Sequence, residues 1–135
     1  MKESLKAGVS TTRRVDIDAS RTIDFMGEEL RVYATPELVR DIEMTCRELL
    51  LEHTDPGEDS VGTAIDVAHT GATPLGAWVE ISAAASKVEG RMVTFEVTVR
   101  DPLEEVAKGR HSRFVVDIAK LRGRVAGKIA KLGSA

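Results

Sequence analysis

Two residues of chemically active type stand where the surrounding pattern indicates apolar side chains. His69 lies in the stretch VAHTGATPLG, residues 67–76, whose small and apolar residues are typical of a buried strand. Glu43 lies in TPELVRDIEMTCRELLLEH, residues 35–53, whose pattern is helical. An imidazole and a carboxylate that meet in a cleft can act as a general acid/base pair, or the carboxylate can act as a nucleophile beside a base. The chemistry therefore depends on whether the fold brings the two together.

The helix over residues 35–53 is the clearest element of the sequence. Thr35 is a favourable N-cap residue, and Pro36 suits the first helical position. At about 100° per residue, the helix has an apolar stripe and an acidic face opposite to it. The stripe contains Val39, Ile42, Cys46, Leu49 and Leu50, and the acidic face contains Glu37, Asp41, Glu48 and Glu52. Glu43 lies only about 20° from Leu50, so it falls within the stripe.

Each of the two residues has two possible interpretations. Glu43 can lie at the edge of the stripe and extend its carboxylate to water. Alternatively, it can point into a cleft under the helix, where an unpaired carboxylate is costly and is usually paired or functional. His69 shares a strand face with Thr63, Ile65 and Val67, because side chains alternate along a strand. A histidine in that position is either a hydrogen-bonded core residue or a catalytic base.

The remainder of the chain predicts an antiparallel sheet. A short strand is expected over residues 13–19, where apolar and polar residues alternate. Four longer strands are expected to pair in chain order as a meander; they span residues 61–72, 77–88, 92–100 and 105–117. One long helix against a sheet of about five strands makes an α+β domain. The length of 135 residues suits one such domain over residues 1–135.

The two ends of the chain are expected to lie outside the sheet and the long helix. Residues 1–12 are expected to be loose. Residues 119–135 form a basic C-terminal segment, and the stretch 118–132 is weakly helical and interrupted by glycines. Acidic residues are absent after Asp117, whereas five cations follow: Lys120, Arg122, Arg124, Lys128 and Lys131. Such a segment is either the solvated face of a helix or a site for a polyanion.

Composition narrows the possible partners and compartment. The net charge of −3 argues against a nucleic-acid partner for the chain as a whole. The N-terminal stretch MKESLKAGVS has no apolar signal region, and no apolar run approaches the roughly 18 residues of a membrane span. Cys46 is the only cysteine, which excludes an intrachain disulfide. We therefore expect a cytoplasmic protein without a membrane partner. His53, His69, His111 and Cys46 lack metal-ligand spacing, so no metal site is expected.

The segment PGEDSVGTAIDVAHTGATPLGAWVEISAAASKVEGRMVTFEVTVRD, residues 56–101, resembles the hotdog-fold acyl-CoA thioesterases of the fluoroacetyl-CoA thioesterase type. The shared pattern is a Gly-Thr loop, a strand that ends in His-Thr-x-Ala-Thr-Pro, and a long strand that closes on Val-Glu-Gly-Arg. The later stretch GRHSRFVVD, residues 109–117, also matches. The similarity extends from about Thr35 to Asp117. It implies a hotdog fold, in which the sheet wraps around the long helix.

The resemblance also implies a catalytic trio. In the family, a Thr at the helix start, a Glu eight residues later and the His of the His-Thr pair form this trio, and here they correspond to Thr35, Glu43 and His69. By the same resemblance, Gly62 offers a backbone N–H to the acyl group and Arg113 meets an anionic part of the ligand. His69 would act as the base, and water or Glu43 would attack the thioester carbonyl. Thr35 and backbone N–H groups at the helix start would stabilise the oxyanion.

The resemblance favours an acyl-CoA thioesterase that acts on a short-chain or small acyl group. Aromatic gating residues of the family lie upstream of the helix, where this chain has FMGEELRVYAT, residues 25–35, and Phe25 and Tyr33 do not align with them. We therefore expect hydrolysis without a preference for fluoroacetate. The alternatives are a non-catalytic hotdog module that binds acyl-CoA or another small ligand, and another hotdog enzyme such as a hydratase. No cofactor is expected, because coenzyme A is part of the substrate.

A homodimer is the expected assembly. One helix covers one face of the sheet, and the strand over residues 61–72 is apolar or small on both faces, so another surface must cover the remainder. The family resemblance implies that two subunits place their sheets side by side, with acyl-CoA between them.

Overall fold

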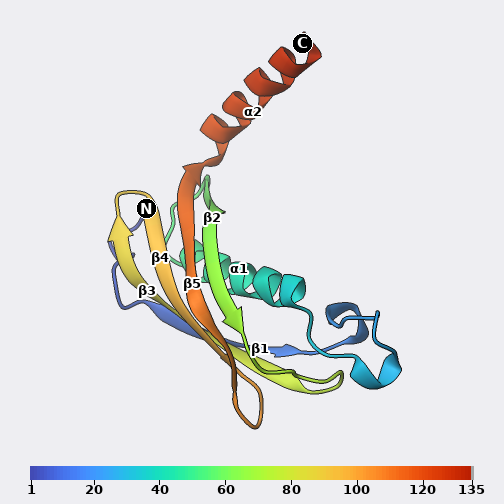
Figure 1. Cartoon of the computed structure of the whole chain (residues 1–135). Helices are drawn as coiled ribbons and strands as arrows, with labels where there is room; N and C mark the ends of the chain where they lie inside the picture. The colour runs from blue at the N-terminus through green and yellow to red at the C-terminus, as the bar shows by residue number, and fades with distance from the viewer. Residues whose placement is uncertain (135) are drawn as a thin grey trace.

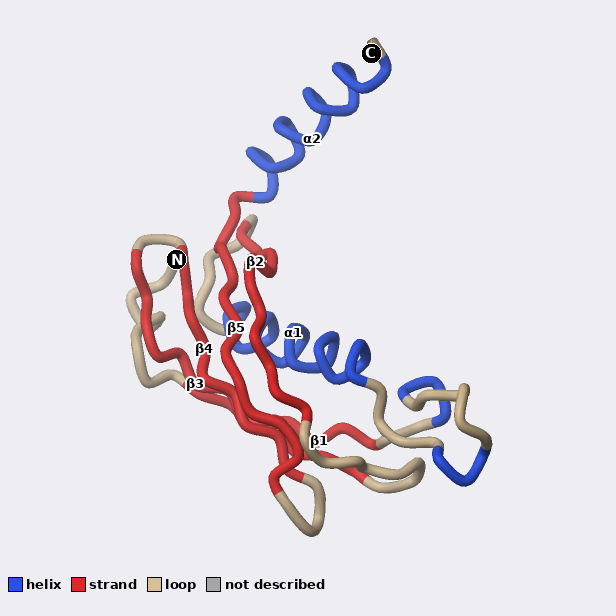
Figure 2. The backbone as a smooth tube through the Cα atoms, viewed as in Figure 1, coloured by secondary structure: helices blue, strands red, loops and turns tan. Residues whose placement is uncertain are grey.

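The computed structural model describes residues 1–134 and contains an antiparallel sheet, a long helix packed against it and a second helix at the C-terminus (Figure 1). The helices are α1 (Thr35–Leu51) and α2 (Ile118–Gly133). The strands are β1 (Ser10–Asp16), β2 (Glu58–His69), β3 (Trp78–Glu89), β4 (Met92–Arg100) and β5 (Glu105–Asp117). Between β1 and α1 lies a lobe of loops that contains two short helical turns (Figure 2), Ala19–Arg21 and Glu28–Leu30. The α+β class expected from the sequence is confirmed.

The order of strands in the sheet is β1-β3-β4-β5-β2. Only β3, β4 and β5 form a meander, so the expectation of a four-strand meander was wrong. The cause is the connection over residues 70–77, which is too long for a tight turn and pairs with the lobe through Val32 and Pro74. That connection carries the chain across the sheet to β3, which lies between β1 and β4, and leaves β2 at the opposite edge beside β5.

The core lies between α1 and the side chains on the face of the sheet that the helix covers. Strand β4 alternates as predicted, and Phe95 is its largest fully buried side chain. The residues of α1 that the fold buries are Leu38, Asp41, Ile42, Thr45, Cys46, Leu49 and Leu50. Cys46 was correctly assigned to the core, and burial raises the pKa of its thiol to about 12, which makes it a poor nucleophile.

The N-terminal segment is ordered, contrary to the expectation that residues 1–12 are loose. Leu5 is buried in the core, and β1 already begins at Ser10. The amino group of Met1 bonds the carboxylates of Asp55 and Glu58, at 2.7 and 2.5 Å. The polar character of this segment concealed its order because backbone bonds, rather than a run of apolar side chains, hold much of it: residues 8–12 bond β3, and the Lys2 N–H donates to the His53 carbonyl.

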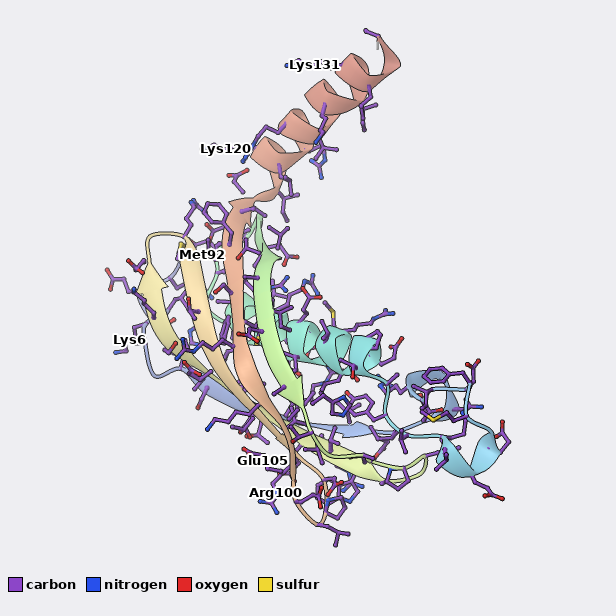
Figure 3. All side chains as sticks on the ribbon, in the orientation of Figure 1. Lys6, Met92, Arg100, Glu105, Lys120 and Lys131 are labelled. Carbon is purple, nitrogen blue, oxygen red and sulfur yellow. The ribbon has the colours of Figure 1, made fainter. Side chains whose placement is uncertain are left out.

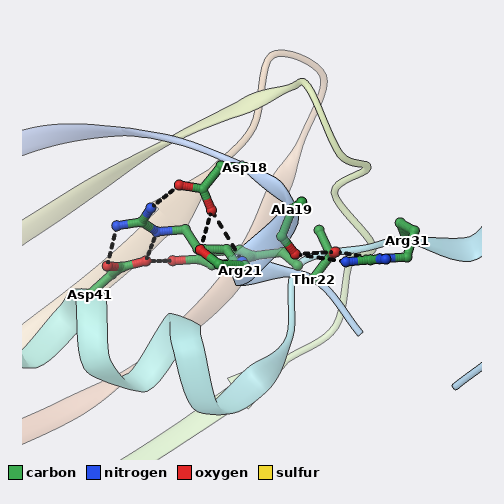
Figure 4. Close-up of polar contacts among 8 residues, drawn as sticks. Asp18, Ala19, Arg21, Thr22, Arg31 and Asp41 are labelled. Atoms are coloured by element: carbon green, nitrogen blue, oxygen red, sulfur yellow. Dashed lines mark hydrogen bonds and ion pairs between the residues drawn. The ribbon is translucent and has the colours of Figure 1, made fainter. Parts of the chain in front are cut away.

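The helical pattern placed Asp41 on the solvent-exposed acidic face of the helix, but its side chain is buried. The hydroxyl of Tyr33 donates to it at 2.5 Å, and Arg21 donates to both carboxylate oxygens at 3.0 and 3.2 Å. Figure 4 shows Arg21 between Asp41 and Asp18, with Arg31 fixing the adjacent backbone through Thr22 and the Ala19 carbonyl. A periodic pattern in one helix cannot reveal a partner that arrives from a loop.

Helix α2 is continuous through Gly123 and Gly127, whereas the sequence suggested an interrupted segment. It begins where β5 ends, and the Asp117 side chain caps it by accepting from the backbone N–H of Lys120 at 3.0 Å. The helix projects away from the sheet, and Lys120 and Lys131 lie along it (Figure 3). No helix within residues 1–134 combines the length and apolar character needed to cross a membrane.

Candidate active site

His69 and Thr35 form one half of the candidate site. His69 ends β2 and Thr35 begins α1, and Thr35 Oγ1 lies 2.8 Å from His69 Nδ1, within hydrogen-bond distance. The predicted N-cap role of Thr35 was wrong, because Ala34 occupies the cap position and the hydroxyl is directed to His69. The Tyr33 ring meets the His69 ring edge-on, with centroids 6.0 Å apart. We call Thr35 and His69 the His69 half-site.

The environment of His69 favours the neutral imidazole. Burial lowers its pKa from the ordinary value, so the ring is uncharged at neutral pH and available as a base. Nε2 is buried and has no hydrogen-bond partner among residues 1–134. A pocket of about 210 Å³ opens beside the ring, and its lining consists of Val32, Tyr33, His69, Thr70, Gly71 and Ala72. The Nδ1–H tautomer, donating to Thr35, leaves the lone pair of Nε2 free to accept a proton.

Glu43 occupies a different part of α1 and faces the start of β2. Its Oε1 lies 3.6 Å from Arg113 Nη1 and 4.0 Å from His111 Nε2, and its side chain is 36 % exposed. Gly62 on β2 lies so close that an added Cβ would overlap Glu43 Oε1, so a larger residue there would displace the Glu43 carboxylate. Glu43 is therefore directed at the sheet and does not simply extend into water. We call Glu43, Gly62, His111 and Arg113 the Glu43 half-site.

Arg113 is buried and fully engaged within this half-site. Its Nε donates to Ser60 Oγ at 2.8 Å and its Nη2 to the Ser60 carbonyl at 2.9 Å. Only 3 % of its surface is exposed. Its guanidinium also pairs with the carboxylate of Glu43, at 3.6 Å from Nη1 to Oε1.

His111 is a site residue that the sequence analysis missed. Its Nδ1–H donates to the Ala64 carbonyl at 2.8 Å, which leaves Nε2 to accept from Arg113 Nη1 at 3.2 Å. Burial lowers the pKa of His111, and the Arg113 charge acts in the same direction. The signal available in the sequence was the spacing of two residues between His111 and Arg113, which puts both on the same face of one strand.

A single chain does not bring the two half-sites together. Thr35 and Glu43 are eight positions apart on a helix, a rise of about 12 Å, and Gly62 and His69 are seven positions apart on a strand, about 23 Å. No hydrogen bond or ion pair joins Glu43 to His69 in the described part of the chain. The direct pair anticipated from the sequence is thus not formed within one subunit.

Both half-sites nevertheless face the helix, because β2 contains a β-bulge. Gly62 pairs with Arg113, Ile65 with His111 and His69 with Ala107, and the register shifts between Gly62 and Ala64. Directly opposed residues lie on the same side of a sheet. The additional residue, Thr63, therefore allows Gly62 and His69 to share a face although they are seven positions apart. The same shift turns Thr63 outward, so it does not share the His69 face as the alternation predicted; its hydroxyl contacts Met92.

Residues 17–119 match the family model of the fluoroacetyl-CoA-specific thioesterases. The chain belongs to this family. The fluoroacetyl-CoA thioesterase of Streptantibioticus cattleyicolor is 32% identical over 132 residues, which cover 93% of this chain and 95% of that protein. A solved structure of a fluoroacetyl-CoA thioesterase has a TM-score of 0.84 and 31% identity, covering 93% of this chain and 98% of that one.

The fold has a second solved counterpart in a hot-dog-like protein from Thermanaerovibrio acidaminovorans. It has a TM-score of 0.83 and 24% identity, and covers 90% of this chain and 91% of that protein. The hotdog fold and the thioesterase family implied by the resemblance are both confirmed. Membership of this family makes the protein a thioester hydrolase.

Proposed function

We propose that the protein hydrolyses small acyl-CoA thioesters at a site formed by Thr35, Glu43 and His69. Membership of the thioesterase family supports the class of reaction and the acyl-CoA substrate. The observation that carries the residue assignment is the Thr35–His69 hydrogen bond at the start of α1, beside the buried, unpartnered Nε2 that residues 1–134 leave to a ligand. A buried polar atom of this kind is costly unless a bound molecule satisfies it.

In this mechanism His69 takes a proton from water through Nε2 as the water oxygen attacks the thioester carbonyl. The carbonyl oxygen becomes an oxyanion, which the backbone N–H groups at the positive end of α1 stabilise. Collapse of the tetrahedral intermediate breaks the C–S bond and expels the coenzyme A thiolate. His69 returns its proton to that thiolate. Glu43 orients the attacking water or, as the alternative, attacks the carbonyl itself to form an anhydride that water then cleaves.

We propose further that two chains complete each site. Strand β2 is an edge strand of twelve residues, and an uncovered edge of this length invites pairing with another strand. Antiparallel pairing of β2 with its copy, about a two-fold axis between Gly62 and His69, places the start of one β2 opposite the end of the other. The Glu43 half-site of one chain then lies beside the partner's His69. The coupling that one chain lacks is formed across this homodimer.

Release of free coenzyme A tests the proposed reaction. The protein is incubated with acyl-CoA thioesters of increasing acyl length and a thiol reagent, and short acyl groups should give the fastest release. Saturable binding of the same thioesters with no release of thiol would instead favour a non-catalytic binding module, and the proposed hydrolysis would be wrong.

Mixed dimers test the shared site. Glu43→Gln and His69→Ala subunits, carrying different affinity tags, are co-expressed and purified through both tags. Each heterodimer contains one intact site and one doubly altered site, so we expect about half of the parent activity per dimer. Homodimers of either variant are the controls and should be nearly inactive. Heterodimers as inactive as these controls would show that each site lies within one chain.

A further inference from the structure

Helix α2 has a large apolar stripe that the described chain leaves uncovered. None of its residues is buried by the rest of residues 1–134. At about 100° per residue, its large apolar residues fall within a sector of roughly 80°; they are Ile118, Leu121, Val125, Ile129 and Leu132. Ile129 and Leu132 are 63% and 66% exposed. The projecting position of α2 is plain in Figures 1 and 2.

Such a helix needs a contact outside its own chain. Isolated helices of about 15 residues are marginal in water, and each interior glycine costs roughly 1 kcal/mol relative to alanine. An added Cβ at Gly123 or Gly127 would meet no atom within 4 Å, so packing inside the described chain gives no reason for these glycines. A continuous helix with this composition indicates that another surface covers it.

Within the lobe between β1 and α1, residues 22–31, which we call the 22–31 lobe, present a second uncovered apolar surface. Phe25, Met26 and Leu30 are 74%, 55% and 52% exposed. The lobe has three carboxylates, Asp24, Glu28 and Glu29, against the single guanidinium of Arg31, which pairs with Glu28 at 3.2 Å. Helix α2 has five cations and no acid. The two surfaces are therefore complementary both in apolar character and in charge.

The two surfaces lie at opposite ends of β2 within one chain. Asp117, from which α2 begins, pairs with Glu58 at the start of β2. The lobe precedes Thr35, which bonds His69 at the end of β2. A strand of twelve residues spans roughly 40 Å, so α2 is remote from its own lobe. Antiparallel pairing of two β2 strands reverses one of them and brings the start of each strand to the end of its copy.

We propose that α2 of each chain docks, through its apolar stripe, on the 22–31 lobe of a second copy of the chain. This inference rests on the β2-edge dimer of the proposed function and assigns that dimer a second, reciprocal contact. The docked helix packs beside the partner's His69 half-site, because the lobe leads directly into Thr35. A basic amphipathic helix can also bind an anionic lipid surface. The acidic apolar lobe in the same chain favours a second copy as the occupant.

Hydrogen exchange of the full-length protein, followed by mass spectrometry, tests this docking. Amides of α2 should be protected in the parent dimer. The double variant Phe25→Ser, Leu30→Ser should raise their exchange rate by about 10-fold or more, although neither residue lies near α2 in its own chain. Reciprocally, Val125→Ser with Ile129→Ser should speed exchange in the lobe. The control is Leu103→Ser, an 87% exposed residue in the β4–β5 turn, which should change neither segment.

Four results would overturn the docking. The first two are rapid exchange of the α2 amides in a dimer, and protection of α2 that the lobe variants leave unchanged. The other two are protection of α2 in a protein that light scattering shows to be monomeric, and protection that requires vesicles containing phosphatidylglycerol. Release of coenzyme A, measured on the same samples, separates this proposal from the proposed function. Hydrolysis with unprotected α2 overturns only the docking. Lobe-dependent protection of α2, without hydrolysis of any acyl-CoA, overturns only the proposed function.

Discussion

His69 is held in the state that a base requires by burial and by its bond to Thr35. Because burial disfavours the charged imidazole, the neutral form persists to a lower pH than in a free histidine, whose pKa is about 6.5. We predict that kcat/KM for coenzyme A release rises with pH along a limb whose midpoint lies below that value. A pH–rate profile measures it. His53→Gln, which alters a histidine bonded to Ser4, should leave the midpoint in place. A midpoint above 6.5 would exclude His69 as the base.

Glu43 and His69 should behave as one catalytic unit. Glu43→Gln keeps the shape of the side chain and removes its charge, and we predict that kcat falls by roughly 10²- to 10⁴-fold. His69→Ala should lower kcat by a similar factor, and the double variant should lose little more. Steady-state kinetics measures all three. Glu48→Gln, at 58% exposure, is the matched control and should retain full activity. Parent-like turnover by Glu43→Gln would remove Glu43 from the mechanism.

Sequence periodicity could identify Glu43, because a carboxylate inside an apolar stripe is visible from the helix alone. It could not show that Arg113 and His111 face Glu43, since that contact joins residues about seventy positions apart in the chain. For the same reason Thr35 had the pattern of an N-cap, whereas its hydroxyl bonds a histidine at the end of a strand. Local patterns identified the reactive side chains, and long-range pairing determined their partners.

Among the elements, the strands and α1 could be predicted to within a few residues, but their neighbours could not. Alternation of apolar residues indicates that β4 is a strand with one buried face, and it does not specify which strand lies beside it. The position of β2 at the edge depends on the connection over residues 70–77, whose backbone pairs with the lobe: the N–H of Tyr33 donates to the Thr73 carbonyl at 2.8 Å. No short-range pattern in the sequence predicts that contact.

Asp41 on α1 accepts the hydrogen bonds from Arg21 and Tyr33 that attach the lobe to this helix. Asp41→Ala leaves the Tyr33 hydroxyl without its acceptor and removes one of the two carboxylates that Arg21 bonds, and we predict a loss of about 2–3 kcal/mol in the free energy of unfolding. Urea denaturation measures it. Because the Tyr33 ring packs on His69, turnover should also fall. The exposed Asp16, bonded only to Arg14 at 3.3 Å, supplies the control Asp16→Ala, which should cost less than about 0.5 kcal/mol. An equal loss in both variants would contradict the network.

For the molecule as a whole, the buried His111 and the half-buried His69 make stability depend on pH. Burial lowers the pKa of both His69 and His111, so below about pH 6.5 the unfolded chain binds protons that the folded chain does not. The free energy of unfolding should therefore fall as the pH decreases from 7.5 to 5. Urea denaturation at several pH values measures the slope, which His111→Asn should reduce. A stability that increases toward pH 5 would contradict this sign.

The assembly should depend on the edge of β2. Ile65 is 38% exposed near the middle of that strand, and its side chain faces the helix side of the sheet. We predict that Ile65→Asp, which puts a charge at the pairing surface, yields monomers by light scattering and lowers activity at least 10-fold, because the half-sites separate. Thr12→Asp makes the same change of charge on β1, the opposite edge strand, and should leave the dimer intact. A fully active monomer would refute the shared site.

The additional residue in β2 gives the strand a frame, comparable to that of a coding sequence. Two side chains on a regular strand face the same way only when the count from one to the other is even, but Gly62 and His69 are seven apart, and Thr63 corrects the phase. Deleting one of residues 64–68 while the bulge persists would turn either the glycine or the histidine to the far side of the sheet, whereas deleting Thr63 itself would leave a regular strand with both facing the helix. Deleting two of residues 64–68, with the bulge kept, would leave both facing the helix. In any relative that lacks the bulge, the interval between these two positions must therefore be an even number.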